Sequence, residues 1–274
     1  MKSYKKWLAA FIIVAAVLVW FFFFLSGRSS SRQTIVVATD SDTAPYTFKK
    51  KGKFDGYDIA LVKAIFKDSK DYKVSFETVA FSSIMTGIDS GRFQMSANNF
   101  NYSKERAEKY LFSNPISKSN YAIASKEGRY KTLDDLSGKS VEVYTGSNYA
   151  AVLENWNKRN RDKKPIVIKY VANTVTLAQR LQHVEDGRTD ALLYDAISLK
   201  TVIKDQNITL KVTTVKGNIG DKRDGLEYLL LANDKTGKAL QKYINSRVKE
   251  LRKNGTLKKL SQRYFAGDYV STLD

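Results

Sequence analysis

Arg106 is the residue of this sequence best suited to bind a small carboxylate. It lies in the run NFNYSKERAEKYLFS, residues 99–113, where a short polar segment passes into an expected helix. A guanidinium group presents a planar fork of N–H donors that matches the two oxygens of a carboxylate. An arginine among lysines and glutamates is also typical of a solvated helix face. Arg106 therefore needs partners elsewhere before it defines a site.

A second group of residues could supply what else a free amino acid requires. Backbone N–H groups at a helix start stabilise a carboxylate, and a carboxylate side chain stabilises an ammonium group. Ser147 and Asn148 follow Gly146 at an expected helix start, and Asp195 ends the apolar run ALLY. Ligands of open α/β sheets bind beside the carboxyl ends of the strands. The pattern predicts that Arg106 and Asp195 hold the two poles of one zwitterion.

The elements that must position these residues alternate between strands and helices. Apolar and β-branched runs predict strands at 34–39, 74–79, 140–144, 166–171 and 191–194. Asp58 is expected to cap one of the intervening helices, and Ser82 or Ser83 another. Two successive units of this kind predict an α/β protein with two lobes. One lobe is expected to comprise 33–118 plus 222–274, and the other 119–221.

The amino-terminal segment has the composition of a membrane-spanning helix. Residues 7–25 are uncharged, and a helix of this length can cross about 30 Å of hydrocarbon. Three lysines precede the segment, so the positive-inside rule places the amino terminus in the cytoplasm. Bulky phenylalanines at 21–24 favour a retained single-pass anchor over a cleaved signal peptide. Residues 1–32 are therefore expected to be an anchor or signal segment with a short tether, with the rest of the chain outside the cell membrane.

Composition narrows the classes of function. The 274 residues include 46 Lys and Arg against 28 Asp and Glu, a formal net charge of +18. No recognisable nucleic-acid motif accompanies this charge, so a nucleic-acid partner is not expected. The chain has no cysteine, which excludes disulfides and thiolate metal sites. His183 is the only histidine, and no catalytic triad or metal cluster can be built around it. Neither an enzyme nor a bound cofactor is expected.

Several motifs, in their order along the chain, resemble the amino-acid-binding proteins of ABC importers, solute-binding protein family 3. They are VVATDSDTAPYTF, FDGYDIALVKAIF, FSSIMTGIDSGRF, the run around Arg106, DLSGKSVEVYTGSN, DGRTDALLYD and NGTLKKLSQRYF. The resemblance covers nearly all of 34–266. It implies a periplasmic-binding-protein type II fold with two hinge crossings. Such a protein closes its lobes on a ligand and docks on a membrane permease that works with an ATPase.

The resemblance also assigns roles to individual residues. It implies that Arg106 binds the α-carboxylate of an amino acid, together with backbone N–H groups of Ser147 and Asn148. It implies that Asp195 binds the α-ammonium group. Asp40 corresponds to the aspartate that ends the first strand of the family.

The pocket is expected to depart from the family pattern in its polarity. Phe81 corresponds to an aromatic wall, but Thr43 replaces an aromatic lid, and Asn99 and Asn101 stand where glycine and threonine are usual. Amide side chains add donors and acceptors, although the asparagines could equally be simple turn formers. The asparagine-rich strand end is similar to the cystine-binding branch of the family. A polar amino acid such as cystine is therefore the expected ligand.

Two alternatives would use the same fold. A membrane-tethered amino-acid sensor or adhesin would keep the binding site and lose the transporter partners. A dehydratase would need a further acid–base group at the cleft, and no residue stands out for that role. The expected setting of the protein is the cell membrane of a Gram-positive bacterium.

Overall fold

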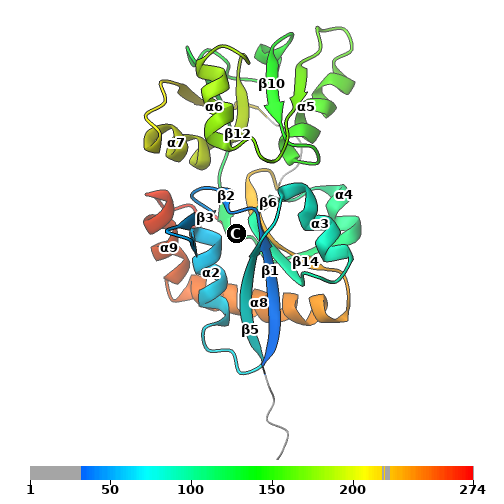
Figure 1. Ribbon diagram of the computed structural model, residues 1–274, viewed down its shortest axis with the longest axis vertical. Coiled ribbons are helices and arrows are strands. Elements are labelled where there is room, and N and C mark those ends of the chain that lie inside the picture. Colours follow the sequence, from blue (N-terminus) through cyan, green and yellow to red (C-terminus); the bar gives the residue numbers. More distant parts are fainter. Residues whose placement is uncertain (1–31, 218, 220–222, 274) are drawn as a thin grey trace, which may run out of the picture.

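The computed structural model describes residues 32–217, 219 and 223–273, which form two lobes stacked along the long axis of the molecule (Figure 1). The chain passes from lobe 1 to lobe 2 between β8 and β9 and returns between β13 and β14. The predicted membrane segment at 7–25 lies outside the described residues. Among the residues that are described, no helix combines the length and apolar composition that a membrane crossing requires.

Lobe 1 is built on a six-stranded mixed sheet. Its strands, in spatial order, are β5 (Tyr72–Thr78), β1 (Gln33–Thr39), β6 (Met95–Asn101), β14 (Leu226–Ala232) and β7 (Tyr110–Phe112), with β8 (Ser117–Lys118) also pairing with β14. β1 is parallel to β5 and β6, whereas β14 is antiparallel to its three neighbours. Because β14 follows lobe 2 in the chain, lobe 1 is complete only after the second crossing.

Helices cover both faces of this sheet (Figure 1). The helices of lobe 1 are α2 (Tyr57–Phe66), α3 (Phe81–Asp89), α4 (Lys104–Lys109), α8 (Lys235–Lys253) and α9 (Thr256–Phe265). A small antiparallel sheet of β2 (Asp42–Thr43), β3 (Thr47–Lys50) and β4 (Lys53–Asp55) precedes α2. The apolar stripes of α2, α8 and α9 pack into one buried cluster with the central strands. The sheet therefore holds the ends of β1 and β6 rigidly at the side that faces lobe 2.

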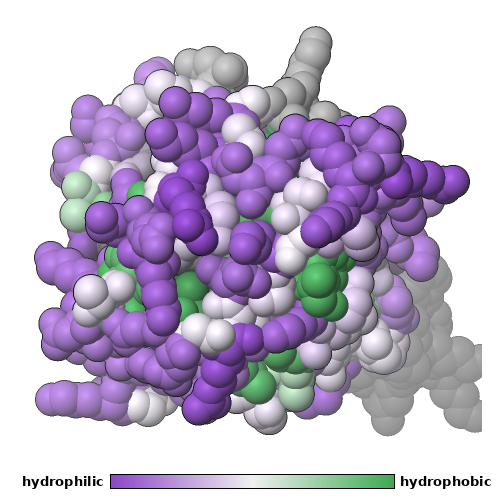
Figure 2. All heavy atoms as spheres, turned by 90° about the horizontal axis from the view of Figure 1, so that it is seen from above, coloured by the Kyte–Doolittle hydropathy of each residue, from purple (hydrophilic) through white to green (hydrophobic). Residues whose placement is uncertain are grey.

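Lobe 2 has two smaller sheets around a single core. One is the antiparallel set of β12 (Leu192–Asp195), β9 (Tyr121–Ser125) and β13 (Lys211–Thr214), and the other pairs β10 (Ser140–Val143) with β11 (Val167–Tyr170) in parallel. Its helices are η1 (Asp134–Leu136), α5 (Asn148–Arg159), α6 (Leu177–Glu185) and α7 (Ala196–Asp205). Seen from above, the molecule presents a mainly hydrophilic surface with small, separate apolar spots (Figure 2).

Two helix starts differ from the sequence-based expectation. The cap of α2 is Gly56, and Asp58 lies inside the helix and is fully buried. Helix α3 begins at Phe81 after Ala80 and has no side-chain cap, so neither Ser82 nor Ser83 has the expected role. A serine or aspartate can cap a helix only where its own backbone is still extended. Here the backbones of both serines are already helical.

Gly56 lets α2 begin directly against the preceding hairpin. Its φ is 118°, and a Cβ at this position would lie 2.2 Å from the backbone oxygen of Tyr46. That oxygen accepts a hydrogen bond from the N–H of Asp58 at 3.0 Å. Only glycine combines this backbone conformation with so close an approach.

The buried Asp58 carboxyl meets a second buried acid, Glu227 of β14. Oδ2 of Asp58 accepts from the N–H of Asn99 at 3.0 Å, and Glu227 accepts from the hydroxyl of Ser117. Burial raises the pKa of Glu227 well above its usual value, and the neighbouring Asp58 carboxyl raises the pKa further. Burial also raises the pKa of Asp58, against which the hydrogen bond from Glu227 acts. The pair therefore shares a proton that resides on Glu227 and supports the strand end at Asn99.

The close approach at Gly56 makes its substitution more costly than that of a comparable glycine. We expect Gly56→Ala to lower the free energy of unfolding by about 2–4 kcal/mol, through clash and backbone strain. Gly52 is the matched control, because its φ is also positive but nothing lies within 4 Å of an added Cβ. Gly52→Ala should cost about 1 kcal/mol. Urea denaturation measures both values, and equal losses would contradict the close-approach argument.

The raised pKa of Glu227 predicts a specific pH dependence of stability. When folding raises the pKa of an acid, the folded state keeps the proton that the unfolded state loses at higher pH. The stabilisation is therefore complete only below the unfolded pKa, and it is lost as the pH rises toward the folded pKa. Relative to wild type, Glu227→Gln should therefore gain up to about 1.4 kcal/mol of unfolding free energy per pH unit above about pH 4.5. Urea denaturation between pH 5 and 8 measures this difference, with the exposed Glu105→Gln as control. Parallel profiles for wild type and Glu227→Gln would show that no buried proton is held there.

Candidate functional site

A cavity between the two lobes encloses about 450 Å³, including the part open to solvent. Lobe 1 contributes residues that follow β1, begin α3, end β6 and lie in α4, and lobe 2 contributes residues that follow β10, begin α5, lie in α6 and end β12. Seven of the eight predicted site residues line this cavity, namely Asp40, Phe81, Asn99, Asn101, Arg106, Ser147 and Asn148. The eighth, Asp195, is not among the lining residues. The cavity's position between the lobes and its mixed polar and aromatic lining are those of a pocket for a small molecule.

Arg106 crosses the cleft from lobe 1 to lobe 2. Ser103 caps α4 by accepting from the N–H of Arg106 at 3.1 Å, which fixes the backbone of this short helix. The guanidinium Nη2 donates to the carbonyl of Gly146 at 2.9 Å, and Nη1 donates to the side-chain oxygen of Asn148. The Cζ atom lies 5.2 Å from the ring centroid of Phe100. Arg106 thus ties α4 to the start of α5 in the other lobe.

The acceptors that surround the Arg106 guanidinium are neutral. They are the carbonyls of Gly146 and Asn101 and the amide of Asn148, and Arg106 has no ion pair with the described residues. Burial lowers the pKa of Arg106 to about 10, so the group stays charged at neutral pH. Charge-assisted hydrogen bonds to a carboxylate are about twice as strong as those to neutral acceptors. A carboxylate is therefore the best partner for this guanidinium.

The start of α5 offers backbone donors beside Arg106. Gly146 has a φ of 72°, which turns the chain after β10 into the helix. Ser147 is the cap, and its Oγ accepts from the N–H of Ala150 at 3.2 Å. The N–H of Ser147 itself donates to the carbonyl of Tyr144. In the first turn, the N–H groups of Asn148 and Tyr149 have no partner within the helix, and these two can face a bound anion.

Asp40 is a carboxylate held in one orientation at the end of β1. Its Oδ2 accepts from Nδ2 of Asn98 and from the hydroxyl of Thr43, both at 2.9 Å. Its Oδ1 accepts from the N–H of Asp42 at 3.0 Å. The side-chain oxygen of Asn98 returns the contact by accepting from the N–H of Asp40 at 2.9 Å. Asp40 therefore presents a fixed negative charge to the cavity.

Asn99 and Asn101, the two asparagines of β6 among the predicted site residues, differ in what they do. Asn99 has a φ of 49°, in the left-handed region that asparagine tolerates better than most residues. This conformation agrees with the turn-forming interpretation. Asn101 donates from Nδ2 to the carbonyl of Leu226 at 3.1 Å, while its own carbonyl accepts from Arg106. Asn101 therefore links the cavity to the returning strand β14.

Asp195 lies beside the cavity rather than on its wall. It is the N-cap of α7, and its Oδ1 accepts from the N–H of Ser198 at 2.8 Å. Burial raises the pKa of Asp195, and neighbouring groups that include Ser119 and Tyr46 act against this rise. The residue before it, Tyr194, does line the cavity.

Sequence reasoning missed several lining residues, of which Arg180 on α6 is the most unusual. Only 2% of Arg180 is exposed. Its Cζ lies 4.1 Å from the ring centroid of Tyr144 and 5.2 Å from that of Tyr194. A signal for it existed, because Arg180 stands three residues after Leu177 and four before Val184, both buried on the inner face of α6. A charged residue at such a position indicates a buried polar site.

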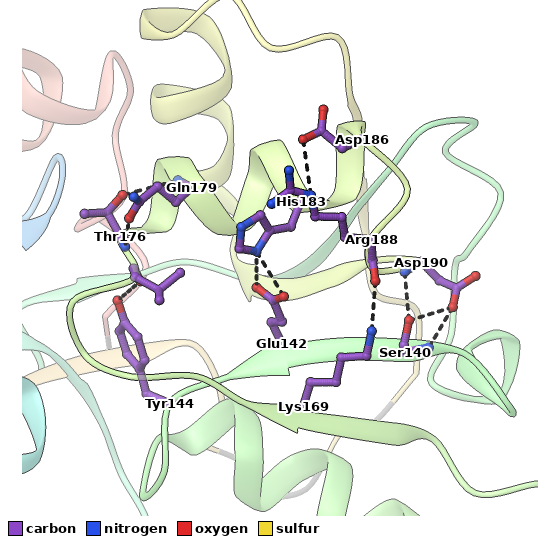
Figure 3. Close-up of polar contacts among 11 residues, drawn as sticks. Ser140, Glu142, Tyr144, Lys169, Thr176, Gln179, His183, Asp186, Arg188 and Asp190 are labelled. Carbon is purple, nitrogen blue, oxygen red and sulfur yellow. Dashed lines mark hydrogen bonds and ion pairs between the residues drawn. The ribbon is translucent and has the colours of Figure 1, made fainter.

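Helix α6 is fixed against β10 by contacts at both of its ends (Figure 3). Thr176 and Gln179 form a capping box at its start. The Tyr144 hydroxyl donates to the carbonyl of Val175 at 2.6 Å. Near the other end, Nδ1 of His183 lies 3.0 Å from Glu142. The only histidine of the chain is therefore part of a polar contact within lobe 2, outside the cavity lining.

Direct contacts close the cleft around the cavity. The Phe81 and Tyr144 rings stack across it with centroids 6.3 Å apart. Nδ2 of Asn173 donates to the hydroxyl of Ser82 at 2.9 Å. Asp42 also lies at this boundary, where burial and then the Asp40 charge raise its pKa to about 6. Among the described residues, no cluster of three or more metal-ligating side chains is present. The arrangement is suited to enclosing a polar organic molecule.

Comparisons with known proteins agree with this architecture. Residues 35–267 match the family model of bacterial extracellular solute-binding proteins, family 3. The L-cystine-binding protein TcyJ of Bacillus subtilis is 32% identical over 241 residues, which are 86% of this chain and 86% of the relative. The probable amino-acid-binding protein YxeM of the same species is 31% identical, over 85% of this chain and 84% of the relative.

Solved structures extend the likeness to three dimensions. One comes from work on glutathione import in Gram-positive bacteria via GshT and the cystine ABC importer TcyBC of Streptococcus mutans. It has a TM-score of 0.80 and 35% identity, and the match covers 87% of this chain and 97% of that one. A putative L-cystine ABC transporter protein from Listeria monocytogenes has a TM-score of 0.73 and 27% identity, over 86% of this chain and 98% of that one. The chain thus has the two-lobed periplasmic-binding-protein fold and belongs to the bacterial extracellular solute-binding proteins, family 3.

Proposed function

We propose that this chain is the extracellular binding component of an ABC importer for amino acids, with cystine as its ligand. In this proposal the protein captures the amino acid between its lobes and delivers it to a membrane permease that works with an ATPase. The names of the Bacillus subtilis and Listeria monocytogenes relatives support cystine. A single-pass anchor at 7–25 would keep the protein at the outer face of the cell membrane.

One observation carries this proposal. The charged guanidinium of Arg106 spans the cleft and contacts only neutral acceptors, beside the first turn of α5 in the other lobe. A ligand carboxylate placed there would bond to both lobes at once. Binding would then favour the closed form by the difference in affinity between closed and open states.

The ammonium group of the ligand is proposed to face the acidic side of the pocket. Asp40 is the carboxylate that lines the cavity, and its hydrogen bonds hold it in place. Asp195, to which the family resemblance assigns this role, is a second contributor. Its buried carboxylate lies next to Tyr194 in the chain and would act on the ammonium group through its charge.

Binding is proposed to occur without turnover. Three tyrosines line the pocket, Tyr144, Tyr149 and Tyr194, and burial raises the pKa of each. Their hydroxyls therefore stay protonated at neutral pH and cannot serve as bases. Because the chain has no cysteine, it can hold a disulfide-containing ligand without thiol–disulfide exchange.

The first test is binding by the purified full-length protein. Differential scanning fluorimetry against the natural amino acids and L-cystine should show its largest rise in melting temperature with L-cystine, because a ligand that binds only the folded state stabilises it. Titration calorimetry should then give a stoichiometry of one. The absence of a shift with every amino acid would contradict the proposed function.

Arg106 is expected to dominate affinity. Arg106→Met should weaken cystine binding by about 2–5 kcal/mol, because the ligand carboxylate would lose its charged partner inside the cleft. Arg106→Lys keeps the charge but loses the fork, and we expect it to recover only part of the affinity. Lys104→Met, at an exposed position of the same helix, is the control. Unchanged calorimetric affinity in Arg106→Met would remove Arg106 from the site.

The two acidic candidates can be separated by neutralising each in turn. Asp40→Asn should weaken binding at least about tenfold, because Asp40 lines the cavity and would contact the ammonium group. Asp195→Asn should weaken binding less than Asp40→Asn if Asp195 acts only through its charge. Calorimetry on both variants measures the two losses. A larger loss in Asp195→Asn would assign the direct contact to Asp195.

A further inference from the structure

Arg180 is a second cation of the cavity that the binding of one zwitterion does not use. It is among the largest fully buried side chains and is 2% exposed. Its Nε has no hydrogen-bond partner, and Arg180 forms no ion pair with the described residues. Burying a charged group is costly unless it is paired. A buried guanidinium on a pocket wall is therefore a site for an anion.

The two guanidiniums of the cavity are separated by a row of three aromatic rings. The Arg106 guanidinium lies over Phe100, and the Phe100 ring stacks with Phe81 at 5.9 Å between centroids. Phe81 in turn stacks with Tyr144 at 6.3 Å, and the Arg180 guanidinium lies over Tyr144. The cavity thus has a positive group at each end of an aromatic wall. A ligand with a carboxylate at each end of an apolar segment could meet a guanidinium at both ends.

The position of Arg180 is held by the structure around it. Its helix α6 is capped by Thr176, and the Tyr144 hydroxyl reaches the carbonyl just before that cap (Figure 3). The ring of Tyr194 lies on another side of the guanidinium, with its centroid 5.2 Å from Cζ. Asp42 is near enough for its charge to act on Arg180, since the Arg180 charge acts to lower the pKa of Asp42. Neither Asp40 nor Asp42 forms an ion pair with Arg180, and its Nε donor has no hydrogen-bond partner, so this donor is available to a ligand.

We propose that Arg180 binds a second carboxylate, at the end of the ligand opposite the α-carboxylate held by Arg106. The substrate class is then amino acids that carry a distal carboxylate beyond an apolar segment, of which cystine is one. This inference rests on the proposed function, because it takes the α-carboxylate to be at Arg106. It adds a residue that selects among amino acids by the charge of their far end.

Three thioether amino acids of similar length isolate the contribution of the distal group to binding by the wild-type protein. They are S-(2-carboxyethyl)-L-cysteine, S-(2-aminoethyl)-L-cysteine and S-propyl-L-cysteine, which end in a carboxylate, an ammonium group and a methyl group. Calorimetry should show that the carboxylate compound binds at least about tenfold more tightly than the propyl compound, as expected for a charge-assisted contact. The ammonium compound should bind most weakly. Equal affinities, or a preference for the ammonium end, would overturn the inference.

Substitution of Arg180 should erase this preference and leave the rest of binding intact. In Arg180→Met, the carboxylate compound should fall to the affinity of the propyl compound, while the propyl compound changes by less than about threefold. Arg188→Met, at an exposed position just after α6, is the control and should keep the wild-type preference. A preference that survives in Arg180→Met, or an equal loss for all three compounds, would show that Arg180 shapes the pocket without binding the distal group.

The outcomes separate this inference from the proposed function. If the wild-type protein binds none of the three compounds, no amino acid and no cystine, the proposed function itself fails. If it binds them without regard to the distal group, only the role of Arg180 fails. Circular dichroism of Arg180→Met checks its folding, and the wild-type ligand series tests the inference even where that variant does not fold.

Discussion

The contact on which the rest of the molecule depends is that of the Arg106 guanidinium with the start of α5 in the opposite lobe. A charged group that meets only neutral oxygens across a cleft holds the lobes together, and its charge has no ionic partner among the described residues. The surrounding fold holds both partners of this contact in place. The sheet of lobe 1 fixes the strand end before α4, and the parallel pair of β10 and β11 fixes the glycine turn before α5.

The support beneath the pocket is itself polar and buried. Asp58 holds the backbone of Asn99, and Glu227 retains the proton that lets the two acids lie together. Glu227 belongs to β14, which enters lobe 1 only after lobe 2 has been traversed. The floor of the ligand site therefore depends on a contact between early and late parts of the chain, and a disturbance of either crossing would reach the pocket through it.

Local rules are enough to predict much of this arrangement. Arg106 and Ser147 follow strand ends, where short-range sequence signals are strong, and both line the cavity. The sequence favours Asp58 as a helix cap, which is wrong. Its burial depends on Glu227, and no local sequence pattern reveals so distant a partner. Arg180 escapes prediction because α6 has the pattern of an ordinary amphipathic helix unless each inward position is checked for charge. Strand-end logic places Asp195 on the pocket wall, but its carboxylate also fits the start of α7, where it caps the helix.

The side chain of Asn148 has a consequence for how a bound molecule leaves. Its amide oxygen accepts from Arg106, so a ligand carboxylate bound there, as we propose, would have to replace it. Binding would then exchange one hydrogen-bond acceptor of Arg106 for another. The gain in free energy would be the difference between a hydrogen bond to a charged oxygen and a hydrogen bond to a neutral one. In the closed cleft the guanidinium is already held in one orientation, which limits the conformational entropy lost when a ligand binds. In the proposed function, the carboxamide would compete with the ligand for Arg106 for as long as the lobes stay closed, and it would move away with its own lobe when they separate.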